Sequence, residues 1–272
     1  GTANIGYGYF ASQQNSAHVL EYFGGEWLSE NIKFNHGKML ENYHLIGDGA
    51  YYEGELDQYQ MGQSTTVQWG STPREFALYD WVGEGDSPTW IALLNVGLRG
   101  LENPNLGTWA GRLYVNGEAK NTKKTYAEYN PVTGEPDELC WHGRRWLEAL
   151  QQDFAARADW TCNVPEDCNH APIVCADELD ISGAAGDTVA LSAVVSDPDG
   201  DEMKTAWWVY EEACEYSGEF KGLDVWGTDE AQTSFTIPKD AQKGDYFTVI
   251  LEVSDLSDAP MTRYAEFVIS AI

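Results

Sequence analysis

Two carboxylates stand just ahead of a predicted helix in residues 83–99. Ser87 is a good N-cap, and Pro88 suits the first helical position, where no backbone N–H is needed. Glu84 and Asp86 precede this helix start, where the helix dipole favours negative charge. Loops above a buried helix are also where α/β enzymes present metal ligands and acids. The pair therefore has two interpretations: solvated acids that cap a helix, or a metal ligand beside a catalytic acid.

A second candidate is the segment Gly107–Arg112. Its glycines allow close backbone approach, Trp109 offers a flat apolar face, and Arg112 offers five N–H donors. A sugar ring has one apolar face and many hydroxyls, so this combination suits a carbohydrate. The alternative is a turn whose tryptophan packs against the neighbouring helix.

Basic residues gather at the start of a predicted helix, in His142-Gly-Arg144-Arg145-Trp146. Cations there oppose the helix dipole. They therefore predict an acidic partner, such as the loop with Glu84 and Asp86, or else a solvated basic face.

Two further patterns lie in the C-terminal third. Asp197-Pro-Asp199-Gly-Asp201 resembles part of a calcium loop, although the twelve-residue EF-hand pattern is incomplete, and a plain turn is the alternative. Trp207 and Trp208 are adjacent on a predicted strand, so one ring faces the core and the other faces outward. The outward ring is either a carbohydrate platform or an ordinary exposed aromatic.

Composition narrows the class of protein. The 272 residues carry a formal net charge of −28, which argues against nucleic acid or an anionic membrane as partner. No run of about 18 apolar residues is present to span a bilayer. The start of the chain has no initiator Met or signal peptide, so we expect a processed or truncated protein.

The cysteines are compatible with an oxidising compartment. Two disulfides are possible, one between Cys162 and Cys168 and the other between Cys175 and Cys214. Cys140 would then have no disulfide partner. Zinc is the alternative, but the C-x5-C spacing with His170 nearby does not match the usual ligand pattern.

The predicted secondary structure changes along the chain, from helices in the N-terminal part to strands in the C-terminal part. Helices are predicted within 12–33, over 87–98 and over 142–160. Beyond residue 171 the pattern alternates. Strands are predicted at 172–175, 179–182, 187–196, 203–210, 233–237, 245–254 and 261–270. Seven short strands in about 100 residues are typical of an immunoglobulin-like sandwich. We therefore predict an α/β domain at 1–162 and an all-β domain at 171–272.

Taken in order, several motifs resemble a known family. They are Glu84-Gly-Asp-Ser-Pro88, Asn95-Val-Gly-Leu98, Gly107–Arg112, Arg144-Arg-Trp146, Asp153-Phe-Ala-Ala-Arg157-Ala-Asp-Trp160, Asn169-His-Ala-Pro172 and Asp197-Pro-Asp-Gly-Asp201. The family is that of bacterial cellulose-binding proteins with a nucleoside-hydrolase-like domain followed by an immunoglobulin-like C-terminal domain. The resemblance implies that residues 1–162 are the C-terminal part of the nucleoside-hydrolase-like α/β domain.

The resemblance also implies roles for individual residues. Asp86 matches the late calcium-ligand position of that superfamily, and Glu84 lies near the group that assists the leaving base. The Asp-rich loop that supplies the other ligands has no counterpart in this chain, so an N-terminal portion of the same precursor is an expected partner. Trp81, Asn95, Trp109 and Arg112 are the candidate substrate-binding residues.

These arguments predict a secreted, periplasmic or cell-surface bacterial protein that binds cellulose or a related plant or algal polysaccharide. In its full-length form it would hydrolyse a glycosidic bond, with Asp86 on Ca²⁺ and Glu84 as the acid or base. A non-catalytic glycan-binding module, or a surface-interaction module, is the alternative.

Overall fold

A computed structural model describes part of the chain. The described residues are 24–43, 45, 47–49, 65–69, 72–76, 78–79, 91–103, 105–112, 128–129, 136–137, 145–220, 225 and 231–272. The chain divides into two compact units, one comprising residues 1–89, 131–134 and 150–168, the other comprising 90–130, 135–149 and 169–272. The second unit therefore joins residues 90–130 and 135–149, which we expected in the first domain, to the strand-rich region.

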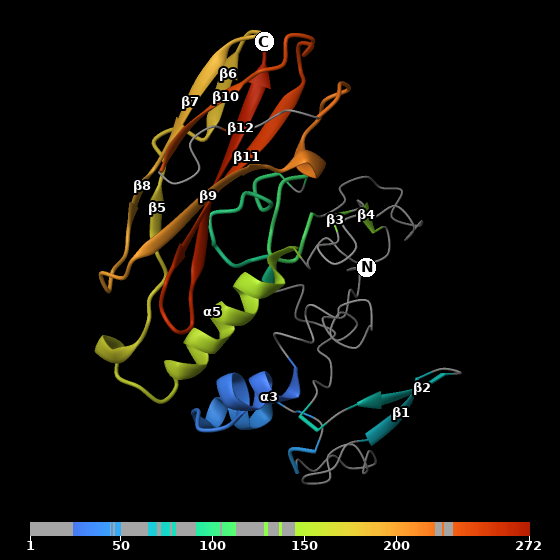
Figure 1. The fold of residues 1–272 in the computed structure, drawn as a ribbon, viewed down its shortest axis with the longest axis vertical. Helices are drawn as coiled ribbons and strands as arrows, with labels where there is room; N and C mark the ends of the chain where they lie inside the picture. The colour runs from blue at the N-terminus through green and yellow to red at the C-terminus, as the bar shows by residue number, and fades with distance from the viewer. Residues whose placement is uncertain are drawn as a thin grey trace. The chain divides into compact units, whose positions relative to one another are not determined.

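The strand-rich region is built on a four-stranded sheet (Figure 1). In spatial order its strands are β6 (Asp180–Gly183), β12 (Thr262–Ala271), β11 (Tyr246–Asp255) and β9 (Met203–Val209). β6 runs parallel to β12, and the other neighbours are antiparallel. The long β11–β12 hairpin forms the centre of this sheet, where the predicted strands are confirmed almost residue for residue.

Two strand pairs lie beside this sheet. β7 (Thr188–Ser192) pairs with β10 (Gln232–Thr236), and β8 (Val194–Ser196) pairs with β5 (Ile173–Cys175). The sequence predicts one strand over 187–196. The structure divides it at Ala193, because the chain there leaves one partner strand for the other.

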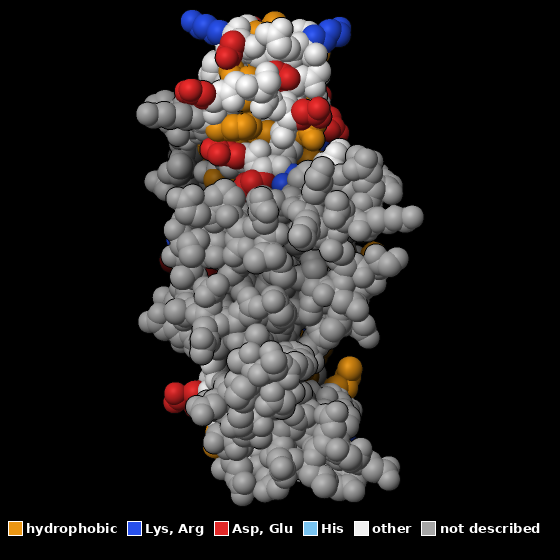
Figure 2. Space-filling model, turned by 90° about the vertical axis from the view of Figure 1, so that its right-hand side faces the viewer, with side chains coloured by type: hydrophobic (Ala, Val, Ile, Leu, Met, Phe, Trp, Pro, Cys, Tyr) orange, Lys and Arg blue, Asp and Glu red, His pale blue; other side chains and the backbone are white. Residues whose placement is uncertain are grey.

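The core lies between the strand layers, and alternation along the strands identifies it. Phe247, Val249, Leu251 and Val253 of β11 are fully buried, and they meet Leu191 of β7 in one apolar cluster. Burial of these side chains from water is the main force that holds the layers together. Figure 2 shows acidic side chains dispersed over the described surface of one face of this region.

The opposite face of the central strands is also buried, which alternation did not predict. Thr248 and Ile250 of β11 and Glu266 of β12 are fully buried although they alternate with the core residues. Residues 96–112 belong to the same compact unit and bond to this part of the sheet. The backbone N–H of Tyr264 donates to the carbonyl oxygen of Val96 at 2.8 Å.

This contact explains why the helix predicted over 87–98 is wrong in its described part. Only Ile91 is helical within 91–98, and the chain then turns. Gly97 has φ of 96°, and a Cβ there would collide with the backbone of Tyr264. Packing against β12 therefore overrides the local helical pattern.

The first unit contributes short elements in its described part. They are α3 (Gly25–Leu28), a π-helical turn η2 (Ser29–Lys33), a 3-10 turn η3 (Lys38–Asn42), the paired strands β1 (Thr65–Trp69) and β2 (Thr72–Phe76), and a 3-10 turn η5 (Pro165–Asp167). The helix predicted over 142–160 is confirmed as α5 (Leu147–Asp159). Two short strands, β3 (Glu128–Tyr129) and β4 (Pro136–Asp137), pair in the second unit. None of the helices among these residues has the length and apolar content needed to cross a membrane.

Within the first unit, polar contacts fasten the short elements to α5. His36 Nε2 lies 3.2 Å from Asp159 Oδ1, and the backbone N–H of Gly37 donates to Thr161 Oγ1 at 2.6 Å. The ring of Tyr43 meets that of Phe154 edge-on, with centroids 5.3 Å apart.

The glycine at position 97 tests the packing of 96–112 on the sheet. We expect Gly97→Ala to lower the free energy of unfolding by more than about 2 kcal/mol, because it adds both left-handed strain and a backbone collision. Gly244 has φ of 101° and open space around it, so Gly244→Ala should cost only about 1 kcal/mol of strain. Urea denaturation of both variants measures the difference, and equal losses would contradict the collision.

Candidate functional site

The predicted site residues lie in different surroundings. Glu84, Asp86 and Trp81 fall outside the described residues. Asn95 is exposed on the turn that follows Ile91. Trp109 and Arg112 are both buried.

The segment Gly107–Arg112 is a tight turn packed into the second unit. The backbone N–H of Gly111 donates to the carbonyl oxygen of Thr108 at 2.8 Å, and the Thr108 hydroxyl donates to the carbonyl oxygen of Gly111 at 2.6 Å. Trp109 is 1% exposed. An indole so buried presents no open face, so the geometry favours the packing alternative over a sugar platform at this residue.

Arg112 is likewise part of the packing. It is 7% exposed, and its guanidinium lies 5.9 Å from the ring centroid of Tyr210. Its donors are therefore turned toward an aromatic layer rather than toward solvent.

That layer is an aromatic–arginine cluster, which we define as Arg145, Trp146, Trp208, Tyr210 and Tyr264. The Trp146 ring is central, with centroids 5.7 Å from Trp208, 5.8 Å from Tyr210 and 5.2 Å from Tyr264. The Arg145 guanidinium lies 4.5 Å from the Tyr210 centroid and 5.2 Å from that of Trp208. Cation–π attraction and ring packing thus hold Arg145 in place.

The two tryptophans of β9 face opposite sides, as the strand alternation predicts. Trp207 is buried in the core and its ring lies 5.4 Å from that of Phe267. Trp208 points to the other side and remains half-buried. The Trp208 side chain hydrogen-bonds to Glu252. Burial raises the pKa of Glu252, and the hydrogen bond from Trp208 lowers it only in part.

The predicted acidic partner for the basic segment exists for Arg145. Its Nη2 lies 2.7 Å from Glu212 Oε1, and both side chains are partly exposed. Glu212 lies in a 3-10 turn, η6 (Glu211–Ala213), directly after β9. Trp208, Arg145 and Glu212 therefore combine a partly open ring with a fixed donor and acceptor.

Glu266 secures residues 96–112 to the sheet beside this cluster. The backbone N–H groups of Arg99 and Gly107 donate to its two carboxylate oxygens, at 2.5 Å and 3.1 Å. Burial raises the pKa of Glu266 to about 7, and these donors and the Arg99 guanidinium lower it only in part. Sequence reasoning missed this residue, although apolar neighbours at the outward positions Ile250 and Val268 were a signal that this face is covered.

Arg99 ties the same segment to the first strand of the sheet. Its guanidinium pairs with Asp180 at the start of β6, with Nη2 at 2.8 Å from Oδ2 and Nη1 at 3.0 Å from Oδ1. It also pairs with Glu102 on its own turn.

The cysteines do not form the expected bonds. Cys162, Cys175 and Cys214 are free thiols, so neither the 162–168 nor the 175–214 disulfide is present. Cys214 instead accepts the backbone N–H of Thr248 and donates to the carbonyl oxygen of Tyr210. Burial raises the pKa of the Cys214 thiol to about 12, which keeps it protonated and unreactive.

Within the described ranges, one group of side chains is close enough to share a cation. It consists of Asp197, Asp199 and Asp201, whose nearest ligand oxygens all lie within 4.8 Å of one another. Asp86 lies outside the described residues, so its fit to calcium rests on the sequence alone.

Comparison with known proteins identifies the family. A family model described as "Cellulose-binding Sde182, nucleoside hydrolase-like domain" matches residues 4–113. A second, described as "Cellulose-binding protein Sde0182, C-terminal domain", matches residues 188–271. The chain belongs to this family. The order of its two domains is the order that the sequence motifs predicted.

A solved relative supports the assignment. It is a nucleoside hydrolase-related hypothetical protein from Saccharophagus degradans that is associated with carbohydrate metabolism, 25% identical, with a TM-score of 0.56. The similarity covers 72% of this chain and 50% of the relative, so this chain spans about half of its length.

More distant proteins add little. The PapD-like domain 7 of human CEP192 shares 10% identity at a TM-score of 0.26, over 40% of this chain and 89% of that domain, which is too weak to inform the fold. No curated protein matches the sequence.

The buried carboxylate of Glu266 makes stability depend on pH. Its pKa is about 7 in the folded chain against 4.5 in the unfolded one, so the folded state holds the proton more tightly between these values. By linkage, the free energy of unfolding falls as pH rises from 4.5 to 7, by up to about 3 kcal/mol from this group. Glu266→Gln should flatten that part of the pH profile.

Urea denaturation at pH 5 and pH 7.5 measures this change in slope. The control is Glu178→Gln, which removes an exposed carboxylate of the same unit and should leave the profile as in wild type. If Glu266→Gln keeps the full decline from pH 5 to pH 7.5, the assignment to Glu266 is wrong.

Proposed function

We propose that this protein binds a polysaccharide, cellulose or a related plant or algal glycan, and that residues 171–272 form an immunoglobulin-like sandwich. One observation carries the proposal: two domains of a cellulose-binding protein family match this chain in order. The two-layer arrangement of the strands and their antiparallel centre support the sandwich. Because the polymer is insoluble and too large to enter a cell, the binding protein works outside the cytoplasm, by secretion or at the bacterial surface.

The half-buried Trp208 is the described aromatic best suited to contact a sugar in the second unit. The ring can cover the apolar face of a pyranose, while Arg145 and Glu212 supply a donor and an acceptor for hydroxyls. These groups are held in place before binding, because Arg145 is fixed against Trp208 and Tyr210. Preorganisation of this kind lowers the entropic cost of binding.

Hydrolysis of a glycosidic bond is the second candidate function. It is favoured by the match of residues 4–113 to a nucleoside-hydrolase-like domain, because that range includes Glu84 and Asp86. In this proposal Asp86 is one carboxylate ligand of Ca²⁺, and an N-terminal portion of the precursor contributes others. The ion would favour the hydroxide form of a bound water, and Glu84 would hold or release the proton at the leaving oxygen.

Adsorption to insoluble cellulose tests the binding proposal. We expect Trp208→Ala to weaken adsorption by about fivefold to tenfold, which corresponds to the loss of roughly one stacking contact. The matched control is Trp160→Ala, since Trp160 also lies under an arginine, with Arg157 at 4.9 Å, but in the other unit. Equal adsorption of wild type and Trp208→Ala would remove Trp208 from the site, and no adsorption of wild type would contradict cellulose as ligand.

Release of soluble sugar separates hydrolysis from binding. If the full-length precursor is an enzyme, it should release reducing ends from the polysaccharide, and Glu84→Gln or Asp86→Asn should lower that rate by at least about 100-fold without reducing adsorption. Adsorption without any sugar release would favour the non-catalytic module. Sugar release that survives both substitutions would contradict these catalytic roles.

A further inference from the structure

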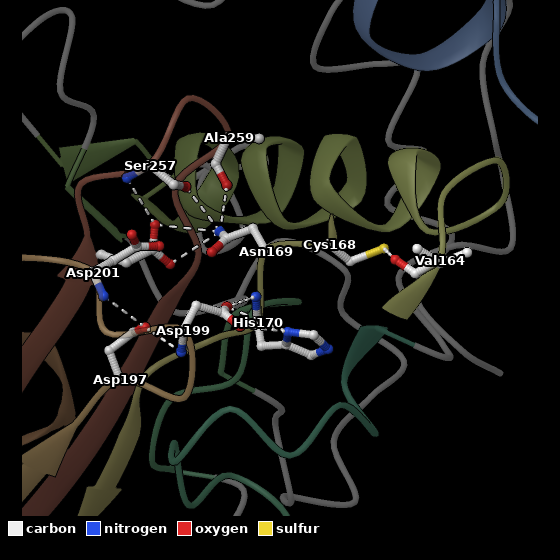
Figure 3. Close-up of polar contacts among 10 residues, drawn as sticks. Val164, Cys168, Asn169, His170, Asp197, Asp199, Asp201, Ser257 and Ala259 are labelled. Carbon is white, nitrogen blue, oxygen red and sulfur yellow. Dashed lines mark hydrogen bonds and ion pairs between the residues drawn. The ribbon is translucent and has the colours of Figure 1, made fainter. Parts of the chain in front are cut away.

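Three carboxylates converge in the turn between β8 and β9. The backbone N–H groups of Asp199 and Asp201 both donate to Oδ1 of Asp197, at 2.8 Å and 3.1 Å. Figure 3 shows these side chains together, with His170 against Asp199. The turn therefore holds three negative charges in a fixed arrangement.

One oxygen in this group lacks the partner that burial requires. Oδ2 of Asp197 is closed off from solvent and accepts no hydrogen bond. A buried carboxylate oxygen without a donor loses its hydration and receives nothing in exchange, which is unfavourable unless a cation supplies the missing contact. This observation is independent of the hydrogen bonds that shape the turn.

A fourth carboxylate increases the negative potential. Asp255, at the end of β11, is fully buried, and its oxygens accept the side-chain amide of Asn169 and the backbone N–H groups of Ser257 and Met261. Among the described residues, only His170 forms an ion pair with any of these four carboxylates.

We propose that the 197–201 turn binds a calcium ion, with Asp197, Asp199 and Asp201 as ligands. The donors are oxygens, which calcium prefers, and their mutual separations of up to 4.8 Å match two calcium–oxygen bonds of about 2.4 Å. Magnesium requires shorter bonds of about 2.1 Å in a stricter octahedron, and zinc prefers nitrogen and sulfur ligands. The site's three proposed ligands do not include Asp86, and the proposal does not depend on any enzymatic activity.

The position of this turn indicates what the ion would stabilise. His170 donates its backbone N–H to Asp199 Oδ2 at 2.6 Å, and Asn169 holds Asp255, so both residues that begin the strand-rich stretch contact this acidic group. A cation that orders Asp199 would therefore also secure residues 169–170.

Calcium titration of the complete chain by calorimetry, with thermal unfolding in calcium and in EDTA, tests the proposal. We expect Asp197→Asn and Asp201→Asn each to weaken calcium binding by at least about tenfold and to abolish the calcium-dependent rise in the unfolding midpoint. Asp177→Asn is the matched control, because Asp177 is an exposed aspartate of the same unit with the same change of charge.

A second variant separates this site from the one expected at Asp86. Asp86→Asn should leave the binding at the 197–201 turn intact. The proposal is overturned if wild type binds no calcium, if Asp197→Asn and Asp201→Asn bind as tightly as Asp177→Asn, or if Asp86→Asn alone removes all binding. Circular dichroism in EDTA verifies that each variant is folded, and Asn at 197 keeps the oxygen that accepts the two backbone N–H groups.

Discussion

The second unit depends on a buried carboxylate that joins a loop to a sheet. Glu266 accepts the backbone N–H groups of Arg99 and Gly107 from the outer side of β12, while its strand neighbours Ala265 and Phe267 face the core. Without these bonds, two loop N–H groups and a carboxylate would be buried without partners, at a cost of several kcal/mol. The attachment of residues 96–112 therefore sets which side chains on this face remain accessible.

The burial of this face of the sheet determines which of the candidate residues remain accessible to a ligand. Trp109 and Arg112 have side chains that suit a sugar, but both are buried in packing contacts. Trp208 lies on the same face of the sheet as Ile250 and Glu266, but on the edge strand β9, and its side chain remains partly exposed. The same layer that buries Trp146 and Tyr210 orients Arg145 toward Glu212. One cluster thus contributes to packing and also holds Trp208, Arg145 and Glu212, the side chains that we propose to contact a sugar.

The hydrophobic pattern along the chain was sufficient to predict strands where burial in one core was the dominant interaction. Alternation in β11 and β12 follows directly from a core on one side, so these strands and their inward residues were predictable. The helical pattern at 91–98 failed because Gly97 lies against the backbone of Tyr264, a contact far away in the sequence. The 175–214 disulfide failed for a similar reason, since the Cys214 thiol hydrogen-bonds to Thr248, 34 residues away in the sequence, as well as to Tyr210.

The sequence by itself determined the family, the order of its two domains and the strands of the C-terminal region, because these are recorded in motifs and in periodicity along the chain. Only the tertiary structure decided that Trp109 and Arg112 are buried, that Glu266 anchors a loop, and that Arg145 pairs with Glu212. Burial and pairing depend on residues distant in sequence, and a pattern read along the chain contains no information on which of its surfaces another segment will cover.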